Sequence, residues 1–253
     1  MIKELARSKY FYWLFQFVRI IKNKLIWSQQ DQDKLVFYQQ FISDGDVVYD
    51  VGANIGNRTK IFSRLASKVI AFEPQESCAR ILRNNFIGDS KVIIVQKALG
   101  AKCGSGNLLL SNANTISSIS QDWIDKVKKS GRFSDFQWNK KEKVEVTTLD
   151  SMIAEFGRPT FIKIDVVGFE YEVIQGLSEK VNNISLEFTP EYIDSTLASL
   201  NYLGNIYNYR ANFIINDNMK FELDSFVSIQ NVIDELLNYK NDSKLFGEVF
   251  LKV

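Results

Sequence analysis

Short apolar runs alternate with glycine turns and with segments of helical periodicity along much of the chain. The clearest example covers residues 46–74. A β-branched run over 47–51 is typical of a strand buried on both faces of a parallel sheet. Apolar residues then recur at helical spacing over 61–66, and a second apolar run occupies 69–72. The pattern predicts a strand, a glycine turn, a helix and a second strand, which together form one βαβ unit.

The rest of the chain continues this alternation, with weaker patterning near its end. Residues 121–141 are polar, lack a core period and are predicted to belong to an insertion over about 105–142. Residues 202–215 carry no clear pattern, and Asp150 is expected to cap the helix that it begins. Further helices are predicted over 29–42, 75–87, 150–156, 191–200 and 228–239, and further strands over 91–95, 108–110, 144–148 (as an edge strand), 161–166, 184–188 and 248–253.

Residues 1–27 are aromatic and basic and contain neither glycine nor proline. Their densest apolar stripe, over 10–21, is interrupted by a glutamine and an arginine, and it is too short to span a bilayer. Two interpretations remain open. The segment could pack as a helix on the domain or on a second subunit, or it could lie in a membrane interface, where aromatic residues with flanking cations are favoured.

Composition changes this picture only modestly. The 253 residues are 45% hydrophobic, which is enough for one α/β domain with a sizeable core and a small extension. The net charge is +1, so nothing favours a nucleic-acid partner, although residues 1–27 hold six basic residues and one acidic. Cys78 and Cys103 have neither metal-motif spacing nor the density of a disulfide scaffold. A cytoplasmic protein is therefore expected, with peripheral membrane association as an option for residues 1–27.

The chain contains no histidine. This excludes a Ser-His-Asp triad, a histidine general base and an imidazole metal ligand. A zinc hydrolase is thereby excluded, whereas a magnesium or calcium site made of carboxylates stays open. Any general base must be Asp, Glu, Lys, Tyr or a bound water, and no metal ligands are predicted.

The turn after the first strand of the βαβ unit favours a nucleotide-like ligand. Gly52 allows a tight turn with bare backbone, and the following helix presents unpaired N–H groups to the same place. Glu73 lies 23 residues beyond Asp50, at the end of the second strand, where a carboxylate can accept hydrogen bonds from both ribose hydroxyls. The glycines at 52 and 56 lack the G-x-G-x-x-G pattern of pyrophosphate binding. The alternative is an ordinary turn with Glu73 solvated.

Two further carboxylates are expected near the same edge of the sheet. Asp165 ends the strand predicted over 161–166, and ligands of open α/β sheets gather beyond the carboxyl ends of strands. Glu187 lies inside an apolar strand, where an unpaired charge would be costly to bury, so it should face a cleft, a metal or a cationic partner. A simple strand-end cap is the alternative for Asp165.

The predicted insertion offers weaker candidates. In the polar loop over 111–120, three side chains could hydrogen-bond a ligand, or the loop could simply be solvated. Beyond it, aromatic residues alternate with polar ones, which suits either a sugar-binding rim or rings that anchor the insertion to the core. The loop candidates are Asn114, Ser117 and Ser118, and the aromatic residues are Trp123, Phe133, Phe136 and Trp138.

Five sequence blocks occur in the order found in one known family. They are DVGANIG at 50–56, AFEP at 71–74, ALG at 98–100, TLD at 148–150 and KIDVVGFE at 163–170. With these blocks the chain resembles the FkbM family of S-adenosylmethionine-dependent methyltransferases. The resemblance implies an α/β class I methyltransferase fold, Rossmann-like, with a seven-stranded mixed sheet covered by helices on both faces. It also implies methyl transfer to a hydroxyl of a sugar or glycan acceptor. A helical extension over 1–42 would precede a methyltransferase domain over 43–253.

The resemblance also implies roles for individual residues. Asp165, Glu170 and Glu187 are the candidate catalytic carboxylates on the acceptor side. The expected small-molecule partner is a sugar or glycan acceptor. A homodimer is a further option. The cofactor would be bound by Asp50, Gly52, Ala53, Asn54, Gly56, Glu73, Pro74, Ala98 and Asp165.

One position departs from the family. The family usually has K-I-D-V-E-G-F-E, whereas this chain has Val167 in place of the first glutamate. Either Glu170 or Glu187 takes over its role, the family glutamate is not the base, or activity is impaired. The alternative function is therefore a non-catalytic binding or assembly protein with the same fold. A nicotinamide-dependent oxidoreductase would share the βαβ unit, but it would need the pyrophosphate glycines that are absent here.

Overall fold

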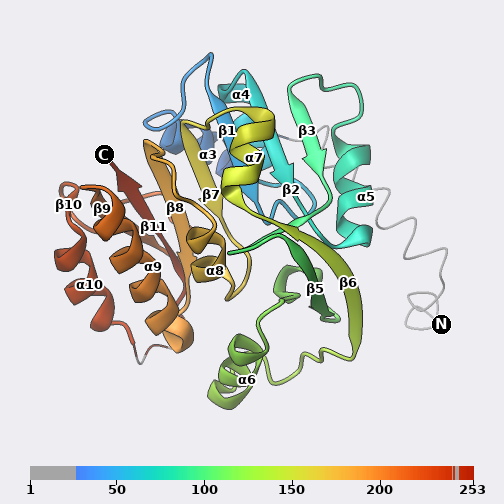
Figure 1. Cartoon of the computed structure of the whole chain (residues 1–253). Helices are drawn as coiled ribbons and strands as arrows, with labels where there is room; N and C mark the ends of the chain where they lie inside the picture. Colours follow the sequence, from blue (N-terminus) through green and yellow to red (C-terminus); the bar gives the residue numbers. More distant parts are fainter. Residues whose placement is uncertain (1–26, 241, 243–244) are drawn as a thin grey trace.

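An eight-stranded mixed sheet forms the centre of the computed structural model, which describes residues 27–240, 242 and 245–253 (Figure 1). The features predicted for residues 1–26 lie outside this range. Five neighbouring strands are parallel, and the last strand of the chain runs antiparallel to both of its neighbours. From one edge to the other, the strands are β10 (Val227–Ser228), β9 (Arg210–Ile215), β11 (Gly247–Lys252), β8 (Asn183–Phe188), β7 (Phe161–Ile164), β1 (Val47–Val51), β2 (Lys68–Phe72) and β3 (Val92–Val95).

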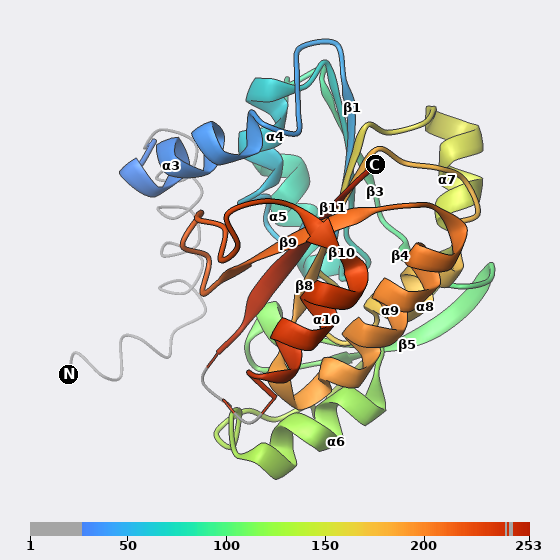
Figure 2. The same cartoon turned by 90° about the vertical axis from the view of Figure 1, so that its left-hand side faces the viewer.

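Helices cover both faces of this sheet, as the edge-on view in Figure 2 shows. Successive strand residues point to opposite faces, so Val48 and Val69 belong to one apolar cluster while Tyr49 and Ile70 belong to the other. On the first face lie α3 (Gln29–Tyr38), α4 (Thr59–Leu65) and α5 (Glu76–Asn85), and on the second lie α7 (Leu149–Phe156), α8 (Glu170–Gln175), α9 (Ile193–Ile206) and α10 (Ile229–Leu237).

Helix α3 is packed on the main domain through aromatic rings. Phe37, Tyr38 and Phe41 are buried against rings of the sheet, including Phe161 and Phe250. Ser28 begins the helix with a capping box, in which its hydroxyl accepts from Asp31 N–H and the Asp31 carboxylate accepts from Ser28 N–H. The helix therefore shares the core of the sheet.

A second, three-stranded sheet lies beyond the carboxyl ends of the central strands (Figure 1). Its middle strand pairs with one parallel and one antiparallel neighbour. A short 3-10 helix, η1 (Asn114–Ile116), and the helix α6 (Gln121–Ser130) connect the last two strands of this sheet along the chain. The strands are, in sheet order, β4 (Ala98–Leu99), β6 (Lys140–Thr147) and β5 (Gly104–Leu110).

The class I methyltransferase fold expected from the sequence is confirmed, with corrections. The main sheet has eight strands rather than seven, because the two-residue β10 pairs with the edge of β9. The strand predicted at 144–148 is not an edge strand, since β6 lies in the middle of the second sheet. Thr148, not Asp150, caps α7, and the Asp150 carboxylate instead accepts hydrogen bonds from Ser178.

Candidate active site

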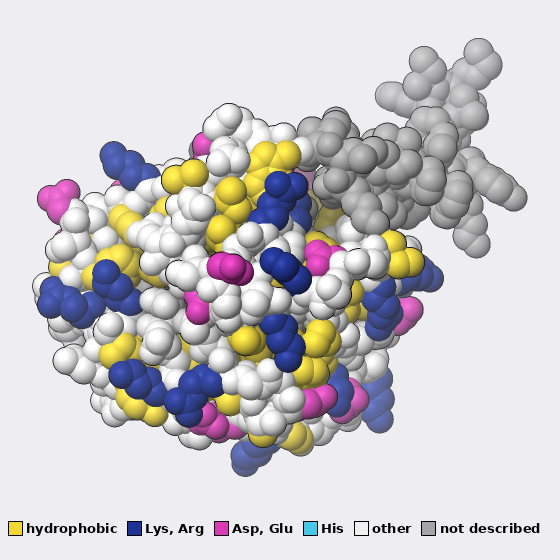
Figure 3. Space-filling view, turned by 90° about the horizontal axis from the view of Figure 1, so that it is seen from above, with side chains coloured by type: hydrophobic (Ala, Val, Ile, Leu, Met, Phe, Trp, Pro, Cys, Tyr) yellow, Lys and Arg dark blue, Asp and Glu magenta, His cyan; other side chains and the backbone are white. Residues whose placement is uncertain are grey.

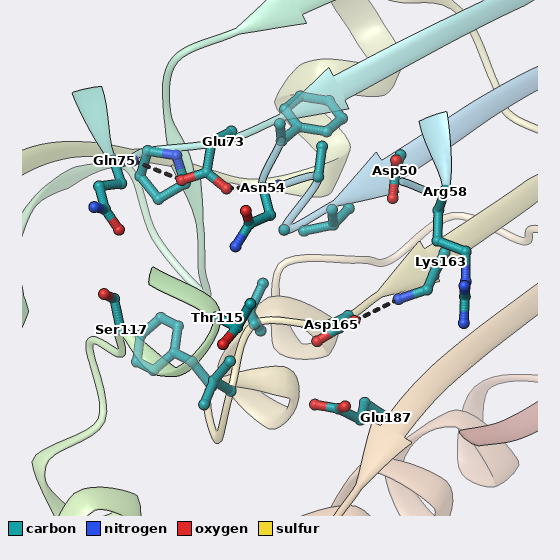
Figure 4. A pocket seen from close by; sticks show the side chains of 18 of the residues that line it. Asp50, Asn54, Arg58, Glu73, Gln75, Thr115, Ser117, Lys163, Asp165 and Glu187 are labelled. Carbon is teal, nitrogen blue, oxygen red and sulfur yellow. Dashed lines mark hydrogen bonds and ion pairs between the residues drawn. The ribbon is translucent and has the colours of Figure 1, made fainter. Parts of the chain in front are cut away.

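A cavity of about 360 Å³ opens at the carboxyl ends of β1, β2, β7 and β8. Charged and polar side chains from all four strands or their following turns line it (Figure 4). Glu73, Asn54 and Gln75 lie toward one end, while Lys163, Asp165 and Glu187 lie toward the other. This is the place where the ligands of open parallel sheets bind. The face of the molecule seen from above in Figure 3 shows basic and acidic side chains interspersed over the coloured residues.

Gly52 brings the turn after β1 into direct contact with β7. Its φ of +83° lies in the left-handed region, and an added Cβ would lie 1.8 Å from the carbonyl oxygen of Asp165. The N–H groups of Gly52 and Ala53 both donate to the carbonyl of Phe72 at 3.0 Å, which ties the turn to β2. Asn54 follows with φ 51°, a conformation that asparagine tolerates better than most residues. The floor of the cavity is therefore backbone without a covering side chain.

Glu73 is buried at the end of β2 and holds the same turn. One carboxylate oxygen accepts the N–H of Asn54 and the other accepts the N–H of Gln75, both at 2.8 Å. Each oxygen keeps a second lone pair for another donor. Burial raises the pKa of Glu73 to about 7, although the two backbone hydrogen bonds oppose this rise. The carboxylate is thus positioned to accept hydroxyl donors from a ligand in the cavity.

Asp50 connects the end of β1 to the helix that follows. Its side chain is buried, and one carboxylate oxygen accepts a hydrogen bond from the Thr59 hydroxyl at 2.6 Å. Burial raises the pKa of Asp50, while the Lys163 ammonium and the Thr59 hydrogen bond act in the opposite direction. The residue lines the cavity and also fixes α4 on β1.

Lys163 and Asp165 form an ion pair at the end of β7. Their Nζ and Oδ2 atoms lie 2.8 Å apart, with Lys163 4% exposed and Asp165 36% exposed. Burial alone would raise the pKa of Asp165, but the Lys163 ammonium outweighs it and lowers this pKa below its usual value. Burial, followed by the neighbouring Asp165 charge, raises the pKa of Glu187 well above its usual value. The cavity therefore contains two neighbouring carboxyl groups whose pKa values are shifted in opposite directions.

The loop from 166 to 168 is held from two sides. The Glu170 carboxylate accepts the N–H groups of Val166 and Gly168, at 3.1 and 3.0 Å. On the other side, the Ser118 hydroxyl donates to the Val167 carbonyl at 2.6 Å. Val167 has φ 56°, which is unusual for a β-branched residue and costs roughly 1–2 kcal/mol. Contacts on both sides of the loop thus maintain a strained backbone at the cavity.

The structure brings most of the predicted site residues together but not all of them. Gly56 does not line the cavity; an added Cβ there would lie 2.5 Å from the Phe86 ring, so this glycine allows close packing on α5. Glu170 does not line it either, because its carboxylate points into the loop that it organises. Burial raises the pKa of Glu170 to about 7. The predicted residues that do line the cavity are Asp50, Gly52, Ala53, Asn54, Glu73, Pro74, Ala98, Asp165 and Glu187.

Functional candidates that the sequence analysis missed lie at the end of the cavity near β11. Lys163 could have been found, because it lies two residues before Asp165 and so points to the same face of β7. Arg58 forms an ion pair with Asp217, which also pairs with Lys34 at 2.8 Å. Arg58, Asp217 and Lys34 come from separate parts of the chain, so no local sequence signal connects them.

The polar loop contributes in part to the site. Asn114 lines the cavity, and its amide donates to the Asn54 side-chain oxygen at 3.2 Å, while the Asn54 amide donates to the Asn114 carbonyl at 3.3 Å. Ser117 also lines the cavity. Ser118 is 1% exposed, and its hydroxyl already donates to the Val167 carbonyl, so it is unavailable to a ligand.

The aromatic residues of the insertion anchor it, as one of the two interpretations predicted. Trp123 is buried, and its ring centroid lies 5.9 Å from that of Phe133 and 6.2 Å from that of Trp138. Phe136 packs on Phe133, and Trp138 donates its indole N–H to the Ile116 carbonyl at 2.8 Å. None of these four rings lines the cavity, so they do not form a sugar-binding rim there.

Two negative findings apply to residues 27–240, 242 and 245–253. No group of three or more Asp, Glu or Cys side chains in this range is arranged to hold a metal ion. No helix in the same range is long and apolar enough to cross a membrane.

Comparison with known proteins gives consistent matches. Residues 50–211 match the Methyltransferase FkbM domain family. Hexuronic acid methyltransferase AglP of Haloferax volcanii is 28% identical over 167 residues, which cover 63% of this chain and 63% of that protein. The chain thus matches less than two thirds of that relative's length.

Two solved structures are also similar. Methyltransferase FkbM from Methylobacillus flagellatus KT is 19% identical, with a TM-score of 0.45, over 68% of this chain and 40% of that one. A SAM-dependent O-methyltransferase from Thermotoga maritima is 13% identical, with a TM-score of 0.46, over 90% of this chain and 66% of that one.

Proposed function

This chain belongs to the FkbM family of S-adenosylmethionine-dependent methyltransferases, and we propose that it transfers a methyl group to a hydroxyl of a sugar or glycan acceptor. One observation carries the proposal: Gly52, Glu73 and the Asp165–Glu187 carboxyl pair converge on a single cavity. The hexuronic acid methyltransferase named among its relatives supports a sugar as the acceptor.

The residues present fit the methyl donor. The cavity volume of about 360 Å³ falls in the range of small-molecule sites, roughly 300–1,000 Å³. Glu73 has lone pairs left for two ribose hydroxyls, and Pro74 and Ala98 offer apolar surface beside it for a base. Asp165 is an anion suited to the positive charges of the donor. When bound, S-adenosylmethionine supplies a methyl group activated on a positively charged sulfur.

The chain's own residues then have separate tasks. The Lys163 ammonium keeps Asp165 ionised, so Asp165 can orient a cationic group in line with the acceptor hydroxyl. Burial and the Asp165 charge raise the pKa of Glu187, and positive charge entering the cavity favours its ionised form. A carboxylate with a raised pKa is a more effective general base for a weakly acidic hydroxyl. We assign Glu187 this role.

Glu187→Gln is expected to impair catalysis rather than cofactor binding. This substitution should lower methyl transfer by about 10²–10⁴-fold, since the amide cannot accept the hydroxyl proton. The affinity for S-adenosylhomocysteine, measured by calorimetry, should stay within about twofold, because Glu187 lies at the far end of the cavity from Glu73. Transfer is measured as label taken up from labelled S-adenosylmethionine by the source organism's surface glycans.

The matched control is Glu179→Gln, which changes an exposed glutamate paired with Arg158 away from the cavity. It should leave transfer unchanged. Equal transfer by Glu187→Gln and wild type would show that Glu187 is not the base. If the wild type labels no glycan and Val167→Glu does, the non-catalytic alternative is correct.

The second prediction concerns Glu73 and pH. Ribose hydroxyls donate to the ionised carboxylate, and the pKa of Glu73 is about 7. The affinity for S-adenosylhomocysteine should therefore rise about tenfold between pH 6 and pH 8, as the ionised fraction rises. Glu73→Gln should bind more weakly and lose this pH dependence. The same pH profile in calorimetric titrations of both proteins would exclude the ribose contact.

The cellular location, membrane contact, oligomeric state and domain boundary of this chain are proposals. Cys78 and Cys103 are free thiols in the structure, which supports the proposed cytoplasmic location. Membrane contact through residues 1–27, a homodimer and the division at residue 42 are retained as predictions.

A further inference from the structure

The charge balance of the cavity bears on which sugar could be the acceptor. Each of the three cations that line it among the described residues pairs with an acidic side chain. Asp217 serves both Arg58 and Lys34, and the Arg58 Nε atom is buried without a hydrogen-bond partner. Lys97 precedes Ala98, which we propose lies beside the nucleoside. The three pairs are Arg58 with Asp217, Lys97 with Glu145 at 2.6 Å, and Lys163 with Asp165 at 2.8 Å.

Acidic groups are in excess in the same cavity. Glu187 and Glu248 line it, and neither has an ion-pair partner among residues 27–240, 242 and 245–253. One Glu248 oxygen accepts from the Tyr38 hydroxyl at 3.3 Å, and the other is buried without a hydrogen-bond partner. A carboxylate on the acceptor would lose its water here without meeting a free cation, which is unfavourable.

Val167 adds an apolar surface to the same cavity. It lines the cavity with Val166 and Phe169. The Glu170 and Ser118 hydrogen bonds fix the strained backbone around it, so its side chain has a defined position. A pyranose ring has an apolar C–H face that can pack on such a surface.

We propose that the acceptor is an uncharged sugar whose C–H face packs against Val167, and that this site rejects hexuronic acids. The inference rests on the proposed function, and it separates this chain from the relative named for a hexuronic acid. Two features of the cavity favour a neutral sugar. The acidic side chains outnumber the cations, which disfavours an anionic acceptor, and the apolar surface at Val167 favours an uncharged one.

The experiment compares two forms of one acceptor pool. Surface glycans of the source organism are labelled with the wild-type protein before and after chemical reduction of their uronic acids to neutral hexoses. We expect uptake to stay within about twofold after reduction, and the labelled sugar recovered by hydrolysis to be uncharged. A tenfold fall after reduction, or label in a hexuronic acid or a free amino sugar, overturns the inference while leaving methyl transfer established. Absence of uptake from both pools overturns the proposed function as well.

Val167→Thr tests the role of the side chain at constant shape. Replacing a methyl by a hydroxyl should raise the KM for the labelled glycan about three- to tenfold, with kcat and S-adenosylhomocysteine affinity unchanged. Val36→Thr, at an exposed position on α3, is the matched control and should leave KM unchanged. A fall in kcat without a change in KM would contradict the proposed contact.

Discussion

Gly52→Ala is expected to abolish cofactor binding and to lower the free energy of unfolding by about 3 kcal/mol or more. The new Cβ would lie 1.8 Å from the Asp165 carbonyl oxygen, which is a backbone atom and cannot rotate away. The turn after β1 would have to move away from β7, and this shift would displace every cavity group that the turn positions. The affinity for S-adenosylhomocysteine should fall at least about 100-fold.

Gly45→Ala separates the close contact from backbone strain. Gly45 also has a positive φ, +98°, but no atom lies within 4 Å of the added Cβ. This variant should lose only about 1–2 kcal/mol and bind S-adenosylhomocysteine like the wild type. Urea denaturation and calorimetry give the two quantities. Equal losses of stability and affinity in both variants would show that the approach of Gly52 to β7 has no special role.

Lys163→Met is expected to lower the free energy of unfolding by roughly 1–3 kcal/mol at pH 7, because Lys163 is buried while Asp165 is partly exposed to solvent. The Lys163 side chain is 4% exposed and neutralises Asp165, so its removal leaves the partly exposed Asp165 carboxylate near Glu187 without its ion-pair partner. Methionine fills similar space, which limits any cavity effect. S-adenosylhomocysteine binding should weaken too, because Asp165 would no longer be held ionised.

The pH dependence of this loss has a defined sign. In the wild type the pKa of Asp165 is lowered, so its contribution to stability is present above the unfolded pKa and is lost as pH falls through the folded pKa. In the variant, burial raises that pKa, and ionisation then costs stability as pH rises. The difference between the two proteins should therefore be large at pH 7 and shrink toward pH 4.

Lys240→Met provides the matched control. Lys240 pairs with Asp194 at 3.2 Å, but both side chains are exposed, so this variant should change stability by less than about 1 kcal/mol at either pH. The measurement is urea denaturation at both pH values. A pH-independent loss for Lys163→Met would mean that packing, rather than charge, explains the effect.

Local sequence patterns were sufficient to predict the residues at the centre of the candidate site. The apolar runs around Gly52, the position of Glu73 at a strand end and the strand ending at Asp165 each depend on neighbouring residues, and parallel strands bring such ends to one edge. Glu187 was also placed correctly, because an acid inside an apolar strand needs a polar surface to face. The structure confirms that these residues share a cavity.

Other features depend on contacts between distant segments. Arg58 and Asp217 are 159 residues apart in sequence, and neither lies in a motif. Helix α6 was missed although its buried residues Trp123, Ile124 and Val127 lie at helical spacing, so a local signal was present in the sequence. Glu170 was given an acceptor role, yet its carboxylate is used by the backbone of its own loop, which the spacing of residues could not show.

The crystal structure of this protein with S-adenosylhomocysteine is the most direct test of the proposed cofactor site. We expect both ribose hydroxyls within about 2.6–3.2 Å of the Glu73 carboxylate oxygens. The sulfur should face Asp165 and Glu187, above the bare backbone of Gly52. A nucleoside bound in another part of the molecule, or ribose hydroxyls that do not contact Glu73, would contradict the proposal.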